Sequence, residues 1–246
     1  MICDGAFPRI HDRKIAAHTW LDDYVTTYIQ RDVRQVINVG DLTSFTTFVR
    51  LAAGRSAQEL NLTTLAADAG VVTNTAKAWL SVLETSFLCL RLPPRLGNLR
   101  KQLVKAPKLH FVDSGLLCLL LGIREADQLR HHPLRGAVFE SWIVAEIYKV
   151  QAHAGQTPRL FHYRESRGPE VDLVVERERG LALVEAKSAA TVNEHFLQPL
   201  RKLATQLHAA DPSTHVQSYL LHGGEASQQR SDVTVLGWRQ IQDVAW

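Results

Sequence analysis

Two apolar segments in the second half of the chain carry isolated charged residues. In EVDLVVE, Asp172 stands among apolar residues shortly after the turn signal Gly168-Pro169. In LALVEAK, Glu185 and Lys187 are two residues apart, so a strand points both side chains to one face of its sheet. The polar link RERG between the segments ends in glycine, as short hairpin connections often do. This pattern predicts that Asp172 presents its carboxylate beside Glu185 and Lys187.

Carboxylates that converge on one face repel one another unless a cation is bound, and oxygen ligands suit Mg²⁺. A neighbouring lysine can orient or help deprotonate a water, or stabilise charge on a phosphate in transfer. The alternative is an ordinary cross-strand ion pair of Lys187 with Asp172, which leaves Glu185 unexplained. Glu170 precedes Asp172 by two residues, so it shares that face as a further ligand or a salt-bridge partner.

A third carboxylate comes from the helix expected from about Gly136 to Val150. At about 100° per residue, Glu140 lies at the edge of an apolar arc formed by Phe139, Ile143, Ile147 and Val150. An ionised carboxylate on a core-facing arc is costly unless it has a cation or donors. The alternative is a Glu140 that lies at the boundary in water, and the helix by itself favours that alternative.

The spacing of apolar residues predicts helices and then a hairpin in the first half of the chain. We expect a long amphipathic helix over 19–39, a helix over 42–53, a helix-turn-helix over 62–84, and strands within 87–92 and 103–112. Two helices followed by a β-hairpin form the winged-helix arrangement. A DNA-reading helix would need base-contacting side chains, and the second helix offers few, so a packing or interaction role is an equal alternative.

The second half of the chain is expected to consist mainly of strands. Strands are expected at 160–164, 170–176, 181–187, 216–223 and 233–238, with a helix over 199–210. This order predicts a mixed sheet flanked by helices. The chain therefore reads as an α/β protein with two domains, 1–130 and 131–246.

A stretch without acidic residues separates Glu84 from Asp113. A basic stretch of this kind can track phosphates, which makes DNA a candidate partner, although a solvated loop that is basic by chance is the alternative. Its candidate nucleic-acid-binding residues are Arg91, Arg95, Arg100, Lys101, Lys105 and Lys108.

The acidic residues resemble the PD-(D/E)XK nuclease superfamily, whose pattern is an acidic residue on an early helix, an Asp on one strand and (D/E)-x-K on the next. The resemblance implies a restriction-endonuclease-like fold in which Glu140, Asp172 and Glu185 hold Mg²⁺ or Mn²⁺. It also implies that Lys187 assists the attacking water. In that superfamily the Asp often follows a proline directly, whereas two residues separate Pro169 from Asp172 here.

A wider resemblance covers almost the whole chain, through YVTTYIQRDVRQV, WLSVLETSFL, KAPKLHFVDSGLLCLLLG, RGAVFESWIVAEI, EVDLVV and VEAKS. These segments are similar to the uncharacterised C-terminal region of a large prokaryotic family of AAA-type ATPases. An ATPase domain or another protein is therefore an expected partner. No GxxxxGK[ST] occurs in the chain, so nucleotide hydrolysis by this chain is not supported. We expect either a shortened protein or a fragment of a longer one.

Bulk properties narrow the remaining classes. The net charge is +3, and Cys3, Cys89 and Cys118 form no CxxC pair, so we expect reduced thiols and no zinc site. The apolar run GLLCLLLG is too short to span a bilayer and the first residues lack a signal sequence, which predicts no membrane association and a cytoplasmic location. The leading hypothesis is a Mg²⁺-dependent DNA phosphodiesterase. The alternative is a non-catalytic DNA- or protein-binding module that retains the nuclease-like fold.

Overall fold

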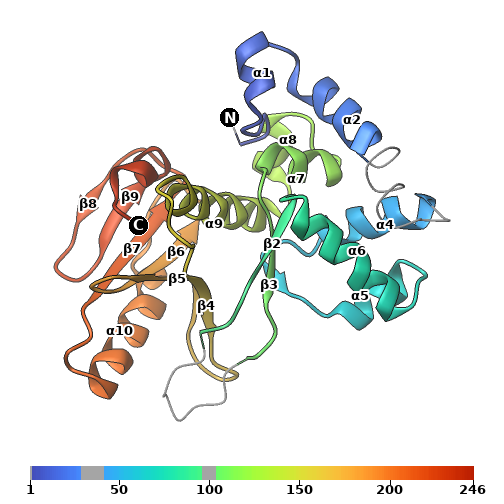
Figure 1. The fold of residues 1–246 in the computed structure, drawn as a ribbon. Coiled ribbons are helices and arrows are strands. Elements are labelled where there is room, and N and C mark those ends of the chain that lie inside the picture. Colours follow the sequence, from blue (N-terminus) through green and yellow to red (C-terminus); the bar gives the residue numbers. More distant parts are fainter. Residues whose placement is uncertain (1, 29–41, 96–103) are drawn as a thin grey trace. The chain divides into compact units, whose positions relative to one another are not determined.

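The structure is a computed structural model that describes residues 2–28, 42–95 and 104–246 (Figure 1). The chain divides into an N-terminal unit, Met1–Arg91 with Leu109–Trp142, and a C-terminal unit, Leu92–Lys108 with Ile143–Trp246. The units differ from a simple division at 130/131 in two respects. The segment 92–108 belongs to the C-terminal unit, and the boundary lies within a long helix.

Short helices dominate the N-terminal unit. They are α1 (Pro8–Arg13), α2 (Ala17–Thr27), α4 (Leu42–Ala53), α5 (Leu62–Asp68), α6 (Thr73–Thr85), α7 (Ser114–Leu120) and α8 (Ala126–His131). The helix expected over 42–53 is confirmed as α4, and Phe45 and Phe48 on it pack edge-on against Trp79 of α6. Only the first part of the helix expected over 19–39 falls within the described residues, as part of α2.

A small sheet accompanies these helices, with the strand order β1-β3-β2. Its strands are β1 (Gln58–Glu59), β2 (Cys89–Leu92) and β3 (Lys108–Phe111). The side chain of Asn61 caps α5 by accepting a hydrogen bond from the N–H of Thr64, 3.0 Å away. Asp113 caps α7 in the same way, accepting from the N–H of Leu116 at 2.8 Å. These caps explain why each helix begins directly after its polar residue.

The C-terminal unit is built on a six-stranded mixed sheet with the order β4-β5-β6-β7-β9-β8 (Figure 1). Its first three strands pair antiparallel, β6, β7 and β9 run parallel, and β8 returns antiparallel. The strands are β4 (Leu160–Arg164), β5 (Glu170–Arg177), β6 (Gly180–Lys187), β7 (Val216–His222), β8 (Gln228–Gln229) and β9 (Thr234–Gly237). The five strands expected from the sequence are therefore present, and β8 is an addition.

One face of this sheet is covered by α10 (Gln198–Ala210), which follows the short 3₁₀ helix Glu194–Leu197 (Figure 1). Its buried residues Leu200, Leu203 and Leu207 share a hydrophobic core with the sheet residues Val174, Leu183 and Leu220. Because β5 and β6 pair with Val174 opposite Leu183, these two residues face α10, and Glu185 shares the face of β6 that Leu183 occupies. Val171 belongs to the same core as Val174, so alternation along β5 is interrupted between these two residues, where the pairing of β4 with β5 shifts register.

The helix α9 (Arg135–His153) passes from one unit to the other. It extends the helix expected over 136–150 at both ends. The short helix α8 replaces part of the link expected before it, and Gln128 Oε1 accepts from the N–H of Glu125 in a capping box. No helix in the described part of the chain is long and apolar enough to cross a membrane.

Candidate functional site

Asp172 and Glu185 lie on neighbouring antiparallel strands, at the end of their paired stretch. The pairing of β5 with β6 runs from Leu173 opposite Val184 to Arg177 opposite Gly180. Just beyond it, Asp172 Oδ2 accepts a hydrogen bond from the N–H of Ala186 at 2.9 Å. This hydrogen bond therefore holds the Asp172 carboxylate against the segment of β6 that carries Glu185.

Two lysines join these carboxylates. Lys187 Nζ lies 2.5 Å from Glu185 Oε1 and 3.8 Å from Asp172 Oδ2. Lys108 Nζ lies 2.8 Å from Glu170 Oε1 and 3.8 Å from Asp172 Oδ1. We call Lys108, Glu170, Asp172, Glu185 and Lys187 the carboxylate–lysine cluster. The predicted juxtaposition of Asp172, Glu185 and Lys187 is present, and so is the alternative contact of Lys187 with Asp172.

The residues of the carboxylate–lysine cluster differ in their exposure to solvent. Lys108 is 2% exposed, Glu185 4% and Asp172 8%. The side chain of Lys187 is 31% exposed and that of Glu170 is 37% exposed. Lys187 and Glu170 are therefore the members that a ligand from solvent meets first.

Burial has a marked effect on Glu185. Loss of hydration and the neighbouring charge of Asp172 raise the pKa of Glu185 to about 8, although Lys187 acts in the opposite direction. One carboxylate oxygen, Oε2, is buried without a hydrogen-bond partner in the described structure. A buried acceptor with no donor is costly, so this atom marks a place where a cation or a proton is favoured.

Glu170 has the opposite tendency. Burial alone would raise its pKa, but the charge and hydrogen bond of Lys108, with a smaller contribution from Arg164, hold the pKa of Glu170 below its ordinary value. Arg164 Nη1 lies 3.4 Å from Glu170 Oε2. Glu170 is thus an ionised salt-bridge partner, one of the two roles expected for it.

These residues can be tested against the chemistry of a divalent ion. Mg²⁺ is often held by one or two protein carboxylates, with water and substrate oxygens completing its shell. Asp172 and Glu185 supply two adjacent carboxylates, and the unpartnered Glu185 Oε2 suits such a ligand. A group of three or more His, Cys, Asp or Glu side chains placed to hold a metal is not found among the described residues. The cluster therefore fits a two-carboxylate ion and not a closed protein cage.

Glu140 lies on the part of α9 that belongs to the N-terminal unit, where it is half-buried. The other three residues implied by the nuclease resemblance belong to the C-terminal unit. The convergence of Glu140 with them stays a prediction.

The candidate nucleic-acid-binding residues separate into different environments. Arg91 forms an ion pair with Glu84, Arg95 pairs with Glu176 at 3.5 Å, and Lys105 is exposed. Arg100 and Lys101 lie outside the described residues. Lys108, expected on the same surface, is instead buried within the carboxylate–lysine cluster.

Lys108 was expected among the candidate nucleic-acid-binding residues and its place beside the carboxylates was not predicted from the sequence; His162 helps to position it. His162 is fully buried on β4, and its Nε2 donates to the carbonyl oxygen of Ala106 at 3.0 Å. Burial lowers the pKa of His162, and the adjacent Lys108 adds to this effect, so the neutral ring is favoured. The ring therefore anchors the segment that carries Lys108. An isolated His in an apolar strand is the only sequence signal for this contact.

Comparison with known proteins identifies two successive segments of the chain. Residues 1–127 match the family of a domain of unknown function, DUF8612, and residues 135–241 match a second domain of unknown function, DUF4143. The DUF4143 domain is typically found with AAA ATPases.

Two similar proteins are uncharacterized proteins of Mycobacterium tuberculosis and Mycobacterium bovis. Each is 30% identical to this chain over 158 residues, which cover 64% of this chain and 35% of the relative. The match thus spans about a third of the length of these relatives. Residues 135–241 are similar to DUF4143, and since the first family covers more than half of the sequence, the chain belongs to the DUF8612 family.

Proposed function

We propose that the carboxylate–lysine cluster is the active site of a divalent-metal-dependent DNA phosphodiesterase. The observation that carries the proposal is the closeness of Asp172 to Glu185, whose buried Oε2 has no hydrogen-bond partner in the described structure. Lys187 lies beside both carboxylates at the exposed edge of the cluster. This combination supports a site that takes a cation between two acids and a phosphate beside a lysine.

Each residue has a role within this proposal. Asp172 and Glu185 would hold Mg²⁺ or Mn²⁺, an ion that supplies positive charge and a bound water of lowered pKa. Lys187 is half-exposed and can donate to a phosphate oxygen or orient a water. Lys108 and Glu170 act as positioning residues, because Lys108 contacts Asp172 from the interior while it is paired with Glu170.

The fold of the C-terminal unit supports the same proposal. A mixed sheet carries an Asp on one strand and Glu-x-Lys on its antiparallel neighbour, with helices beside them. We assign it to the restriction-endonuclease-like class, with Glu140 as the helix residue of the site.

For the N-terminal unit we propose a winged helix. The order α4, β1, α5, α6, β2, β3 and the sheet order β1-β3-β2 support that assignment. In this scheme the winged helix binds DNA or a protein partner, and the chain works beside an AAA-type ATPase domain, an association that the DUF4143 match supports.

The direct experiment is cleavage of plasmid and branched DNA by the full chain in Mg²⁺, in Mn²⁺ and in EDTA. We expect cleavage only with metal, and a loss of at least about 100-fold in Asp172→Asn and Lys187→Met. Glu178→Gln is the matched control, since Glu178 is an exposed carboxylate on the β5–β6 turn. Equal cleavage by the wild type and Asp172→Asn would remove the proposal.

A second candidate is a non-catalytic DNA- or protein-binding module. The observation that favours it is that Lys108 and Lys187 already neutralise charge in the cluster, so its ion pairs can be purely structural. Calorimetric titration with Mn²⁺ separates the two candidates. A catalytic site shows binding that is lost in Asp172→Asn and in Glu185→Gln, whereas a structural cluster shows none.

A further inference from the structure

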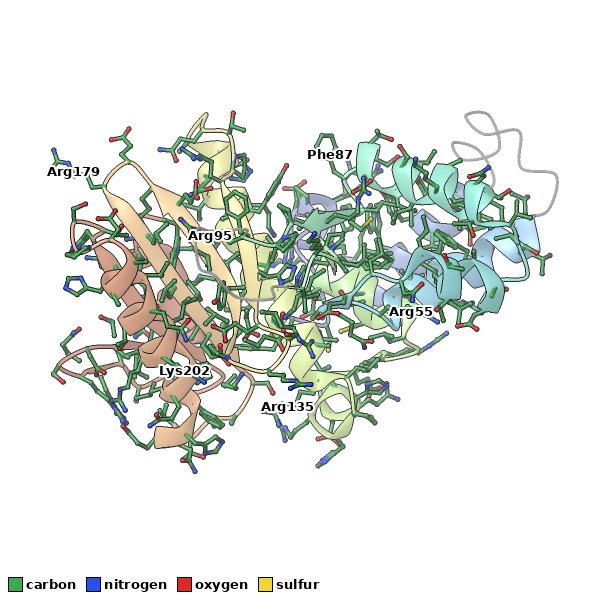
Figure 2. The ribbon with its side chains drawn as sticks, turned by 90° about the horizontal axis from the view of Figure 1, so that it is seen from below. Arg55, Phe87, Arg95, Arg135, Arg179 and Lys202 are labelled. Carbon is green, nitrogen blue, oxygen red and sulfur yellow. The ribbon has the colours of Figure 1, made fainter. Side chains whose placement is uncertain are left out.

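A second concentration of charge lies at the opposite end of β5 and β6 from the carboxylate–lysine cluster. A pocket of about 430 Å³ is lined there by four arginines, Arg95, Arg159, Arg177 and Arg179. Arg177 ends β5 and is five residues from Asp172, which corresponds to about 16 Å along a strand. Figure 2 shows Arg179 extending from the turn between β5 and β6. The pocket is therefore separate from the proposed active site.

The charges around this pocket do not cancel. Its acidic residues are Glu176 and Asp211. The guanidinium of Arg177 stacks on Tyr219 and Trp246, so three guanidiniums, those of Arg95, Arg159 and Arg179, remain beside two carboxylates, a formal excess of one positive charge with His215 neutral. Glu176 is shared, because Arg159 pairs with its Oε2 and Arg95 lies 3.5 Å from its Oε1. Asp211 accepts instead from its own turn, from Ser213 N at 3.0 Å and Thr214 Oγ1 at 2.8 Å.

The guanidiniums of the pocket differ in their partners. Nε of Arg95 lies 3.5 Å from Glu176 Oε1 without a hydrogen bond, and Nε and Nη2 of Arg177 are enclosed by protein. Arg177 is held in place by its Nη1, which donates to Gln217 Oε1 at 2.7 Å, and by stacking on Tyr219 and Trp246. Arg179 forms no hydrogen bond or ion pair with any residue that the structure describes. The pocket thus offers donors in excess of its acceptors.

Backbone hydrogen bonds fix the segments that carry these arginines. The N–H of Arg95 donates to the carbonyl of His162, and the N–H of Glu176 donates to the carbonyl of Arg159. The N–H of Leu181 donates to the carbonyl of His215 at 2.8 Å, which ties the β5–β6 turn to the loop that carries Asp211. The segments that line the pocket are therefore preorganised, so binding of a ligand costs little conformational entropy.

We propose that this arginine pocket binds a phosphate group, either of a nucleic-acid strand or of a free nucleotide. Planar guanidiniums bind phosphate oxygens through paired hydrogen bonds, and both a phosphodiester and a phosphate monoester carry the negative charge that offsets the positive excess of the pocket. The volume of about 430 Å³ lies within the range of small-molecule sites. Arg95, one of the candidate phosphate-binding residues of the basic stretch, contributes to it.

The test is calorimetric titration of the full chain with inorganic pyrophosphate in EDTA, where no metal-dependent cleavage occurs. We expect saturable binding that weakens about tenfold or more in Arg179→Gln and in Arg159→Gln, both with exposed side chains. Arg239→Gln, an equally exposed arginine outside the pocket, should bind as the wild type does. The Asp172→Asn variant should also bind normally, so failure of this pocket is distinguishable from failure of the nuclease proposal.

Competition then identifies the source of the phosphate. ADP and a short single-stranded oligonucleotide are each added to the pyrophosphate complex. Displacement by either one supports the pocket and names its ligand. Pyrophosphate binding that is absent at millimolar concentration, that is unchanged in both variants, or that neither competitor displaces would overturn the proposal.

Discussion

The carboxylate of Asp172 accepts a hydrogen bond from the backbone N–H of Ala186 on the neighbouring strand, at 2.9 Å. Ala186 lies beyond the last paired residues of β5 and β6, Leu173 and Val184. The Asp172 side chain therefore accepts the hydrogen bond of a backbone N–H at the point where the backbone pairing of β5 with β6 ends. Because Ala186 is next to Glu185, the same contact fixes the two carboxylates relative to one another.

This contact predicts different stabilities for two substitutions of Asp172. Asp172→Ala leaves the Ala186 N–H without its acceptor, so we expect a loss of about 1–3 kcal/mol in the free energy of unfolding. Asp172→Asn keeps an acceptor oxygen and should lose less. Urea denaturation followed by circular dichroism measures both. Equal losses would show that charge, and not this hydrogen bond, is what Asp172 contributes.

Glu185 should make the stability depend on pH. Its pKa in the folded chain is about 8, above its ordinary value of 4.5, so the folded state binds this proton more tightly than the unfolded state. The contribution of Glu185 is therefore most favourable below pH 4.5 and is lost as the pH rises toward 8.

In Glu185→Gln this contribution no longer titrates. We expect the variant to gain stability relative to the wild type as the pH increases from 5 to 9, by roughly 1.4 kcal/mol for each pH unit within the window. Denaturation midpoints across that range supply the measurement. Parallel curves for the two proteins would contradict the burial of an ionisable Glu185.

A bound divalent ion should offset the loss of stability that ionisation of the buried Glu185 causes at high pH. An ion that binds only the folded chain stabilises it by about 2.7 kcal/mol at a hundredfold excess over its Kd. We expect Mn²⁺ to raise the Tm of the wild type at pH 8 by several degrees, and not to raise that of Glu185→Gln. The exposed Glu178→Gln serves as the control and should respond as the wild type does. A Tm rise shared by all three proteins would mean that the metal binds elsewhere.

The sequence was informative where strand alternation controls the geometry. Alternation placed Glu185 and Lys187 on one face, and the hairpin link placed Asp172 beside them, as the contacts of Lys187 with both carboxylates confirm. The position of Lys108, the most buried residue of the carboxylate–lysine cluster, was not predictable in this way. Lys108 is distant in sequence, and its basic neighbours give it the pattern of a surface residue.

Short elements were missed for a different reason. Strand β8 consists of two polar residues, Gln228 and Gln229, whose pairing with β9 depends on the sheet already being formed. Helix α8 was predictable, because Glu125 and Gln128 have the spacing of a capping box, but the apolar pattern in six residues is too short to reveal it.

Lys108 and Glu170 should be strongly coupled. Lys108 is 2% exposed and its ammonium lies 2.8 Å from Glu170, so removal of either partner leaves the other with only a longer ion pair, that of Lys108 with Asp172 or that of Glu170 with Arg164. Because Glu170 is partly solvated, we expect Lys108→Met to cost about 1–3 kcal/mol. The double variant with Glu170→Gln should recover part of that loss. A double-mutant cycle of unfolding free energies gives the coupling, and strictly additive effects would contradict it.

The turn between β5 and β6 should tolerate only glycine at position 180. Gly180 has a φ of +106°, and a Cβ there would lie 2.1 Å from the carbonyl oxygen of His215. That oxygen also accepts from the N–H of Leu181, so it cannot move without loss of a hydrogen bond. We expect Gly180→Ala to cost about 2 kcal/mol or more and to weaken phosphate binding in the arginine pocket.

Gly155→Ala is the matched control for this substitution. Gly155 has a φ of +74°, also in the left-handed region, but a Cβ there meets nothing within 4 Å. It should therefore cost only the conformational strain, about 1 kcal/mol, and leave pyrophosphate affinity unchanged. Thermal denaturation and calorimetry of both variants separate strain from the contact with His215. Similar losses in the two variants would mean that the close approach of turn and loop has no part in shaping the pocket.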